Sequence, residues 1–172
     1  MIESGVRLRV ESETYVIDEL LGGGGYGEVW KAERLRDRCC CAIKRLHKAD
    51  ENDLLRLEAL KELQLTDRLA GAAAISDVIR PQGRRQWAGC VMPMADGIGL
   101  DEWLQRDELN IPHNILLSIQ LAKNLADAHA LGIAHGDVHP RNVKVCLRNE
   151  TPVLSLIDWD NAYLPGLPPP RS

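Results

Sequence analysis

The chain has 172 residues, of which 45% are hydrophobic and 27% are charged, and its formal net charge is −4. This length can bury a real core, and the composition is that of an ordinary folded protein, which argues against global disorder. The slight acidity, with no block of like charge, argues against a nucleic-acid surface. We find no signal peptide and no apolar run long enough to span a bilayer, so we expect a cytoplasmic protein without membrane association.

The first third of the chain predicts an antiparallel sheet. Apolar, β-rich stretches cover Thr14–Leu21, Glu28–Glu33 and Cys39–Leu46, and they are separated by a run of glycines and by a polar turn. In the third stretch, Ala42 and Lys44 share one face of the strand, and the small alanine leaves room for a flat ligand beside the lysine. The consecutive cysteines of this strand contain no C-x-x-C pair. We interpret them as reduced thiols rather than as zinc ligands or disulfides.

A helix is predicted next, over Asp53–Ala70. We place Asp53 as its N-cap and Gly71 after its last turn, because aspartate often caps the start of a helix and glycine often ends one. The apolar side chains of this segment recur at helical spacing, at Leu54, Leu57, Leu60 or Lys61, and Leu65.

Two further strands follow the helix, over Ala74–Arg80 and Arg85–Met92, around a turn that contains proline and glycine. Residues 93–99 contain poor strand and helix formers, and we interpret them as a connector between two halves of the chain.

The second half is predicted to be mainly helical. Leu100–Arg106 forms a short helix, and Pro112–Leu131 forms a longer one that begins at a proline and is followed by a glycine. Two short strands, Asn142–Leu147 and Val153–Ile157, are joined by a turn. Residues 164–172 contain four prolines and are expected to form an extended or mobile tail. The long helix carries one continuous stripe, formed by Ile115, Ile119, Ala122, Leu125, Ala126 and His129.

Four short motifs in these elements can carry chemistry. Glycines without Cβ atoms let backbone N–H groups approach phosphate oxygens closely. A glycine run alone can also be a flexible turn. Val29, just after the run, favours a ligand site because it can supply an apolar cover for the base of a nucleotide. The motifs are Gly22–Val29 with the pattern G-x-G-x-x-G-x-V, Ala42-Ile43-Lys44, His135–Asn142 with the pattern H-x-D-x-x-x-x-N, and Leu156–Asn161.

The last two motifs supply oxygen ligands and a proton acceptor. Asp137 can accept or orient the proton of an acceptor hydroxyl, Asn142 can coordinate Mg²⁺, and Asp158 can bridge the metal and the phosphates. Aspartate and asparagine in one loop also occur as simple turn residues. We prefer the catalytic interpretation because this loop lies between a helix and a β-ribbon that ends in another aspartate.

From Tyr15 to Tyr163 the sequence resembles the protein kinase-like superfamily, in which motifs of these kinds follow the same order. The glycine run and Ala42-Ile43-Lys44 are similar to those of eukaryotic-type serine/threonine kinases of bacteria. His135-Gly136-Asp137 with His139-Pro140 is more similar to the catalytic loop of aminoglycoside and choline phosphotransferases.

The resemblance implies an α+β fold with two lobes. An N-lobe over 1–92 would combine an antiparallel sheet with one helix and would bind the nucleotide, and residues 93–99 would form the hinge. Residues 100–163 would form an incomplete, mainly helical C-lobe with the catalytic loop, followed by a Pro-rich tail over 164–172.

The resemblance also implies ATP and Mg²⁺ as cofactors. Lys44 would contact the α/β-phosphates and be held by a glutamate, for which we prefer Glu62 and keep Glu58 as the alternative. Met92 resembles the gatekeeper residue, and the backbone of Met94 would contact adenine. The catalytic residues would be Lys44, Asp137 and Asn142, and the metal ligands Asn142 and Asp158. The nucleotide site would comprise Gly22, Gly24, Gly27, Val29, Ala42, Lys44, Glu62, Met92 and Met94.

The sequence departs from the protein kinase pattern at several points. Gly136 replaces an arginine that senses activation-loop phosphorylation in many protein kinases, and His139 replaces a lysine that assists serine/threonine transfer. Asp160 replaces the usual glycine, and we assign it no role. No A-P-E motif or later helix follows. The chain is then a fragment, is completed by another chain, or is a kinase-like protein that has lost catalysis.

The leading hypothesis is an ATP- and Mg²⁺-dependent protein serine/threonine kinase. One alternative is a kinase of small molecules such as aminoglycosides or choline-like alcohols, and another is a catalytically silent binding module. We expect a protein substrate or partner. The helix over Pro112–Leu131 has a broad apolar stripe and few elements to cover it. We therefore expect the isolated chain to self-associate through the incomplete C-lobe, to bind a partner through this surface, or to be only marginally stable.

Overall fold

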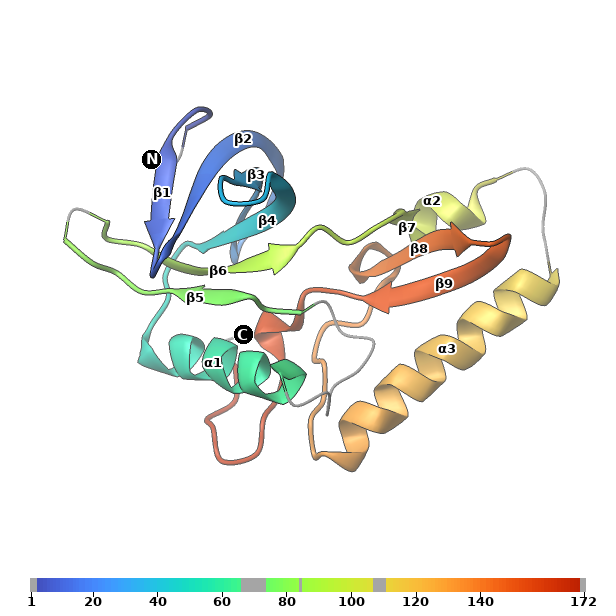
Figure 1. Cartoon of the computed structure of the whole chain (residues 1–172). Helices are drawn as coiled ribbons and strands as arrows, with labels where there is room; N and C mark the ends of the chain where they lie inside the picture. Colours follow the sequence, from blue (N-terminus) through green and yellow to red (C-terminus); the bar gives the residue numbers. More distant parts are fainter. Residues whose placement is uncertain (1–2, 66–73, 84, 107–110, 171–172) are drawn as a thin grey trace. The chain divides into compact units, whose positions relative to one another are not determined.

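The computed structural model describes residues 3–65, 74–83, 85–106 and 111–170. Two compact units make up the chain: Met1–Glu62 with Ala74–Met94, and Leu63–Ala73 with Ala95–Ser172. Each unit has its own sheet (Figure 1). Within the described residues, no helix is long and apolar enough to cross a membrane.

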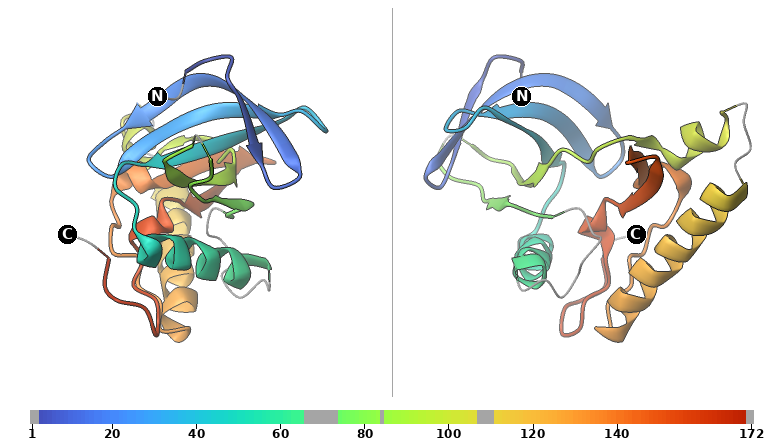
Figure 2. Two further views of the ribbon diagram at one scale, coloured as in Figure 1. Left: turned by 90° about the vertical axis from the view of Figure 1, so that its left-hand side faces the viewer. Right: turned by 45° about the vertical axis from the view of Figure 1, so that its right-hand side comes forward.

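The sheet of the first unit has six strands in the order β1-β2-β3-β4-β6-β5, and all neighbouring strands are antiparallel. This confirms the predicted antiparallel sheet. Strands β2 and β3 are strongly curved (Figure 2). The Nη1 atom of Arg85 donates a hydrogen bond to the carbonyl oxygen of Arg9 at 2.8 Å, which links the β5–β6 turn to β1. The strands are β1 (Arg7–Val10), β2 (Glu13–Gly23), β3 (Gly27–Arg34), β4 (Cys39–Leu46), β5 (Asp77–Ile79) and β6 (Ala88–Pro93).

One face of this sheet holds the core of the first unit. Ile43 on β4 has Trp30 and Val91 as its partners on the two neighbouring strands, so these side chains lie on the same face. Ala42 and Lys44 therefore lie on the opposite face. The buried core cluster comprises Leu8, Val10, Tyr15, Ile17, Ala32, Cys41, Ile43, Ile79 and Val91, with Trp30 and Trp87 packed against it.

Several details of this sheet differ from the sequence-based expectation; β5, for example, covers Asp77–Ile79, whereas a strand over Ala74–Arg80 was predicted. Strand β1 is not predicted by the sequence pattern, because a four-residue alternation of arginine with Leu8 and Val10 is too short to stand out. Pro93, expected in the connector, ends β6, where it pairs with Cys41.

Helix α1 spans Glu51–Leu65, two residues earlier at its start than predicted. Asp53 is not the N-cap: the Asp53 N–H donates to Oδ1 of Asp50 at 3.1 Å, and the Asp50 N–H donates to Oδ2 of Asp53 at 2.8 Å. This reciprocal capping places Asp50 at the helix start. The predicted end at Gly71 lies outside the described residues. The leucines that were expected to face the core, Leu54, Leu57 and Leu60, are buried.

The second unit combines a three-stranded sheet with two α-helices. Strand β7 occupies Ile98–Gly99, within the segment interpreted as a connector, because these residues pair with Val145 and Lys144 of β8. The elements are β7, α2 (Leu100–Leu104), α3 (Ile111–Ala130), the 3-10 turn η1 (Pro140–Asn142), β8 (Val143–Arg148), β9 (Thr151–Leu156) and the 3-10 turn η2 (Trp159–Asn161).

Helix α3 packs against β9 through one face only. Leu117 and Ala128 are its buried residues, and the side chain of Gln120 binds the backbone of β9, donating to the Pro152 carbonyl and accepting from the Leu154 N–H, both at 2.8 Å. The stripe predicted from the sequence lies on another face. Its two isoleucines, Ile115 and Ile119, are 55% and 60% exposed, so the apolar side of α3 faces solvent in this chain.

Candidate active site

The glycine run forms the connection between β2 and β3. The Gly24 N–H donates to the Gly27 carbonyl at 2.9 Å, which closes the turn. Gly27 is required by packing, because a Cβ there would collide with the carbonyl oxygen of Arg45 on β4. Gly22 and Gly24 have nothing within 4 Å of such a Cβ. The fold therefore does not need glycine at Gly22 or Gly24, and their open backbone is free to approach a ligand.

Four predicted nucleotide-binding residues share one face of the first unit's sheet. Val29 is the strand partner of Lys44, and Met92 is the strand partner of Ala42. Since directly paired residues point to the same face, this register brings the four side chains together. Lys44 is only 6% exposed, which is unusual for a lysine and differs from a surface residue that extends into solvent. Met94 is the last residue of the unit.

Sequence reasoning missed two residues beside Lys44. Cys90, its partner on β6, is buried on the same face. Gly89 lies next to Cys90, and a Cβ at Gly89 would collide with the carbonyl oxygen of Lys44. Gly27 and Gly89 thus allow both neighbouring strands to approach β4 closely at Lys44 and Arg45. A glycine within an apolar strand was the available signal for such a close approach.

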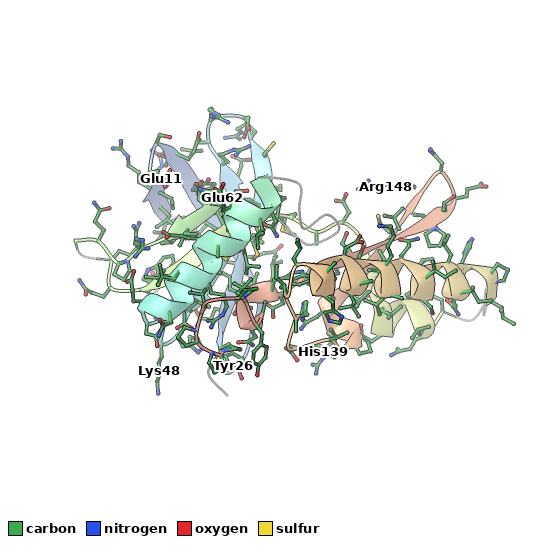
Figure 3. The ribbon with its side chains drawn as sticks, turned by 90° about the horizontal axis from the view of Figure 1, so that it is seen from below. Glu11, Tyr26, Lys48, Glu62, His139 and Arg148 are labelled. Atoms are coloured by element: carbon green, nitrogen blue, oxygen red, sulfur yellow. The ribbon has the colours of Figure 1, made fainter. Side chains whose placement is uncertain are left out.

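The two candidate glutamates of α1 differ in their partners. Glu58 accepts hydrogen bonds from Nε and Nη2 of Arg80 at 3.0 and 2.8 Å, and Arg80 also contacts Glu51 at 3.0 Å. Glu58 is therefore engaged by a surface ion-pair network. Glu62 lies one turn further along α1 (Figure 3). It remains the preferred candidate for pairing with Lys44.

Asp137 and Asn142 are hydrogen-bonded in the second unit. The buried carboxamide of Asn142 donates from Nδ2 to the carbonyl oxygen of Asp137 at 2.9 Å and to its Oδ2 at 3.1 Å. With Nδ2 committed to these two acceptors, Oδ1 of Asn142 is the atom that can coordinate a cation. The loop thus presents one carboxylate and one carboxamide oxygen.

The end of β9 brings Asp158 next to the pair of Asp137 and Asn142. The Ile157 N–H donates to the Asn142 carbonyl at 2.8 Å, so the residue that follows Ile157 leaves the sheet beside Asn142. Asp158 adopts the left-handed conformation with φ of 67°, which costs energy for a non-glycine residue and is typical of functional positions.

The donor set of this region fits Mg²⁺. Asn142 and Asp158 offer oxygen atoms, which Mg²⁺ prefers, and Mg²⁺ at phosphate sites commonly uses one or two carboxylates together with water and substrate oxygens. Among the described residues there is no group of three or more His, Cys, Asp or Glu side chains that could form an all-protein metal cage. A metal held by Asn142 and Asp158 would have its other coordination positions open to water and phosphate oxygens.

His135 stabilises the loop from inside. Its Nδ1 accepts the Asp137 N–H at 3.2 Å, so its Nε2 carries the proton and donates to the Ile157 carbonyl at 2.8 Å. The ring packs edge-on against Trp159, with centroids 4.5 Å apart. Burial lowers the pKa of His135, which keeps the imidazole neutral. These contacts join the loop that carries Asp137 to the segment that carries Asp158.

Glycine is required at position 136 for a physical reason that the sequence did not reveal. Its φ is +82°, and a Cβ at this position would lie 2.6 Å from the carbonyl oxygen of Asn161. Both the conformation and the close approach exclude larger residues. An arginine at this position would therefore require the segment around Asn161 to shift.

The predicted site residues fall in both units. Gly22, Gly24, Gly27, Val29, Ala42, Lys44, Glu62, Met92 and Met94 belong to the first unit, and Asp137, Asn142 and Asp158 belong to the second.

Comparisons with known proteins agree with this geometry. The family described as protein kinase domain matches residues 15–164. The chain is 30% identical over 135 residues to the serine/threonine-protein kinase PknH of Mycobacterium tuberculosis, covering 76% of this chain and 21% of that protein. It is 31% identical over 140 residues to PknA of the same organism, covering 78% and 32%. It is 30% identical over 144 residues to mitogen-activated protein kinase 12 of Danio rerio, covering 81% and 39%.

A solved structure is also similar. The crystal structure of the BubR1 kinase domain superposes with a TM-score of 0.69 at 20% identity, covering 93% of this chain and 50% of that chain. The chain thus spans between about a fifth and two fifths of the length of these curated relatives, and half of the solved kinase domain.

Proposed function

This chain belongs to the protein kinase domain family, and we propose that it supplies the nucleotide-binding and catalytic elements of an ATP- and Mg²⁺-dependent kinase that phosphorylates serine or threonine in proteins. The observation that carries the proposal is the hydrogen-bonded pair of Asp137 and Asn142 beside the end of β9, where Asp158 follows. These three residues match the acceptor-orienting and metal-binding positions of a phosphoryl-transfer site.

Each residue has a role that its surroundings support. The open backbone at Gly22 and Gly24 would bind phosphate oxygens, and buried Lys44 would neutralise part of their charge. Mg²⁺, when bound by Asn142 and Asp158, supplies further charge neutralisation on the phosphates. Asp137 orients the acceptor hydroxyl and receives its proton as the hydroxyl oxygen bonds to the γ-phosphorus and ADP leaves. Apolar Val29 would cover the base.

Protein acceptors are favoured over small alcohols by the relatives, which are named serine/threonine-protein kinases. The alternative of a small-molecule kinase rests on the loop His135–Pro140, which resembles aminoglycoside and choline phosphotransferases. The third possibility, a catalytically silent module, is disfavoured because Lys44, Asp137, Asn142 and Asp158 are all retained. Since all five cysteines are free thiols, the cytoplasm, which keeps thiols reduced, remains the expected compartment.

Nucleotide binding is tested on the 172-residue chain itself. ATP should raise its melting temperature in the presence of Mg²⁺, by an amount equivalent to about 2.7 kcal/mol when ATP is at a hundred times its dissociation constant. Asp158→Asn should remove the Mg²⁺ dependence and keep the fold, because asparagine tolerates the left-handed conformation. Asp127→Asn on α3 is the matched control and should behave as wild type. Equal stabilisation with and without Mg²⁺ would contradict the metal assignment.

Phosphoryl transfer is tested in a longer protein that contains this chain. Labelled ATP would be offered with a set of proteins in one arm and with aminoglycosides and choline in the other. Transfer only to the small alcohols would refute the protein kinase proposal, and no transfer in either arm would favour the silent module. Where transfer occurs, Asp137→Ala should lower kcat by roughly 10²–10⁴ and leave the affinity for ATP unchanged.

A further inference from the structure

We propose that His139 positions Asp137, by directing Oδ2 of the carboxylate so that Oδ1 is the oxygen that receives the acceptor proton. This inference rests on the proposed function, because it assigns a role within the same reaction. His139 is the residue that replaces the lysine of the protein kinase pattern.

The tautomer of His139 follows from its hydrogen bonds. The Arg141 N–H donates to Nδ1 of His139 at 3.2 Å, at the start of η1. A ring nitrogen that accepts a hydrogen bond carries no proton, so the proton is assigned to Nε2. The backbone at the start of η1 therefore orients the ring and leaves Nε2 as a donor.

This donor is directed toward one oxygen of Asp137. Nε2 of His139 lies 3.6 Å from Oδ2, and Nδ2 of Asn142 lies 3.1 Å from the same oxygen. In the described part of the chain, no donor contacts Oδ1 of Asp137 within hydrogen-bond distance. The 3.6 Å separation exceeds an ordinary hydrogen bond, but catalytic contacts are often long without substrate and shorten when it binds.

His139 and Asp137 are both partly exposed side chains. The side chains of His139 and Asp137 are 37% and 45% exposed, and His139 lies on the loop between α3 and β8 (Figure 3). The two ring nitrogens do separate tasks, because Nδ1 binds the backbone and Nε2 faces the carboxylate.

Two substitutions separate these tasks. His139→Asn places an oxygen near the position of Nδ1, so it keeps the bond to the Arg141 N–H but is too short to reach Asp137. His139→Gln extends an amide N–H toward the position of Nε2 and gives up the backbone bond. Positioning predicts that His139→Asn lowers kcat about 10-fold with an unchanged KM for ATP, and that His139→Gln retains most of the wild-type kcat. His129→Asn, at the exposed end of α3, is the control and should have no effect.

The opposite ranking, with His139→Asn active and His139→Gln impaired, would overturn the proposal. His139 would then act only by binding the backbone at the start of η1. Equal kcat in all variants would also overturn it. A second readout does not require activity: imidazole ¹⁵N spectra of the 172-residue chain should show His139 protonated at Nε2, and Asp137→Asn should shift its Nε2 resonance. If the wild-type enzyme transfers no phosphate, the proposed function fails, and these spectra still decide whether His139 contacts Asp137.

Discussion

At the scale of single residues, glycines differ in what the fold requires of them. Gly136 combines a positive φ with a close approach to the Asn161 carbonyl, whereas a Cβ added at Gly25 would have nothing within 4 Å. The first is required by the fold, and the second is open to substitution.

Gly136→Ala should lower the free energy of unfolding by about 1–3 kcal/mol, because alanine pays the left-handed conformational penalty and contacts the Asn161 carbonyl. Gly25→Ala, made in the same background, should change it by less than about 0.5 kcal/mol. Urea titration of both variants measures the difference. Equal midpoints would show that the loop relaxes away from Asn161 without cost.

The buried phenol of Tyr15 predicts that the free energy of unfolding of this chain depends on pH in the alkaline range. This phenol is buried and donates to Oδ2 of Asp77 at 3.3 Å. Burial, with the negative charge of Asp77 as a smaller contribution, raises the pKa of Tyr15 to about 12. In the unfolded chain the phenol ionises near pH 10. Between about pH 10 and 12 the unfolded state therefore binds fewer protons, so the free energy of unfolding falls as the pH rises.

Tyr15→Phe should reduce this alkaline decline while keeping the ring in the core. Urea titrations at pH 9 and pH 11 would give the decline for each protein. The same decline in both would mean that other groups cause it, and Tyr15 would then not be the relevant titrating residue.

At the scale of elements, the start of α1 depends on Asp50. Replacing it with alanine leaves helix N–H groups without their acceptor, and Asp50→Ala should lower the free energy of unfolding by about 1 kcal/mol. Asp50→Asn keeps a side-chain oxygen that accepts from the Asp53 N–H and should stay close to wild type. The comparison is made by thermal or urea unfolding of the 172-residue chain. A loss of the same size in the asparagine variant would point to charge rather than capping.

The elements also show what the sequence could predict. Strand β4 has the predicted bounds, Cys39–Leu46, because a long apolar run between polar turns has few alternatives. The N-cap was predicted at Asp53, but Asp50 caps the start of the helix. Both aspartates have capping side chains, and only the backbone conformation distinguishes them. Local patterns thus located the elements better than their ends.

In the candidate site, too, some residues could be predicted from the sequence and others could not. The motif residues Lys44, Asp137 and Asn142 could be named because their types and spacing are tied to phosphoryl-transfer chemistry. Gly89 and the reason for Gly136 could not be predicted. Each depends on a carbonyl oxygen from a strand or segment that is distant in sequence, and such approaches arise only in the folded chain.

At the scale of the whole chain, the exposed face of α3 is the feature that most needs a partner. Ile111, Ile115 and Ile119 are 60%, 55% and 60% exposed and recur every four residues, so they form one apolar stripe. Fully burying one such side chain is worth about 1.5–3 kcal/mol, and contiguous exposed apolar patches are uncommon on monomers. We propose that two copies of the 172-residue chain associate through this stripe.

Sedimentation velocity over a range of concentrations should show this association, and Ile115→Glu with Ile119→Glu should abolish it. Leu147→Glu is the control, since Leu147 is 52% exposed and lies on β8 rather than on α3. A wild-type chain that remains monomeric at high concentration with a cooperative melt would contradict the proposal.

Gly136 also constrains the evolutionary history open to this chain. In many of the protein kinases that it resembles, an arginine at the corresponding position senses phosphorylation, and a substitution could in principle introduce one here. Here the new side chain would meet the Asn161 carbonyl, 2.6 Å from the position of its Cβ. A protein with this backbone could acquire that form of control only after the segment around Asn161 had moved. Selection for new regulation would therefore act first on other surfaces of the protein.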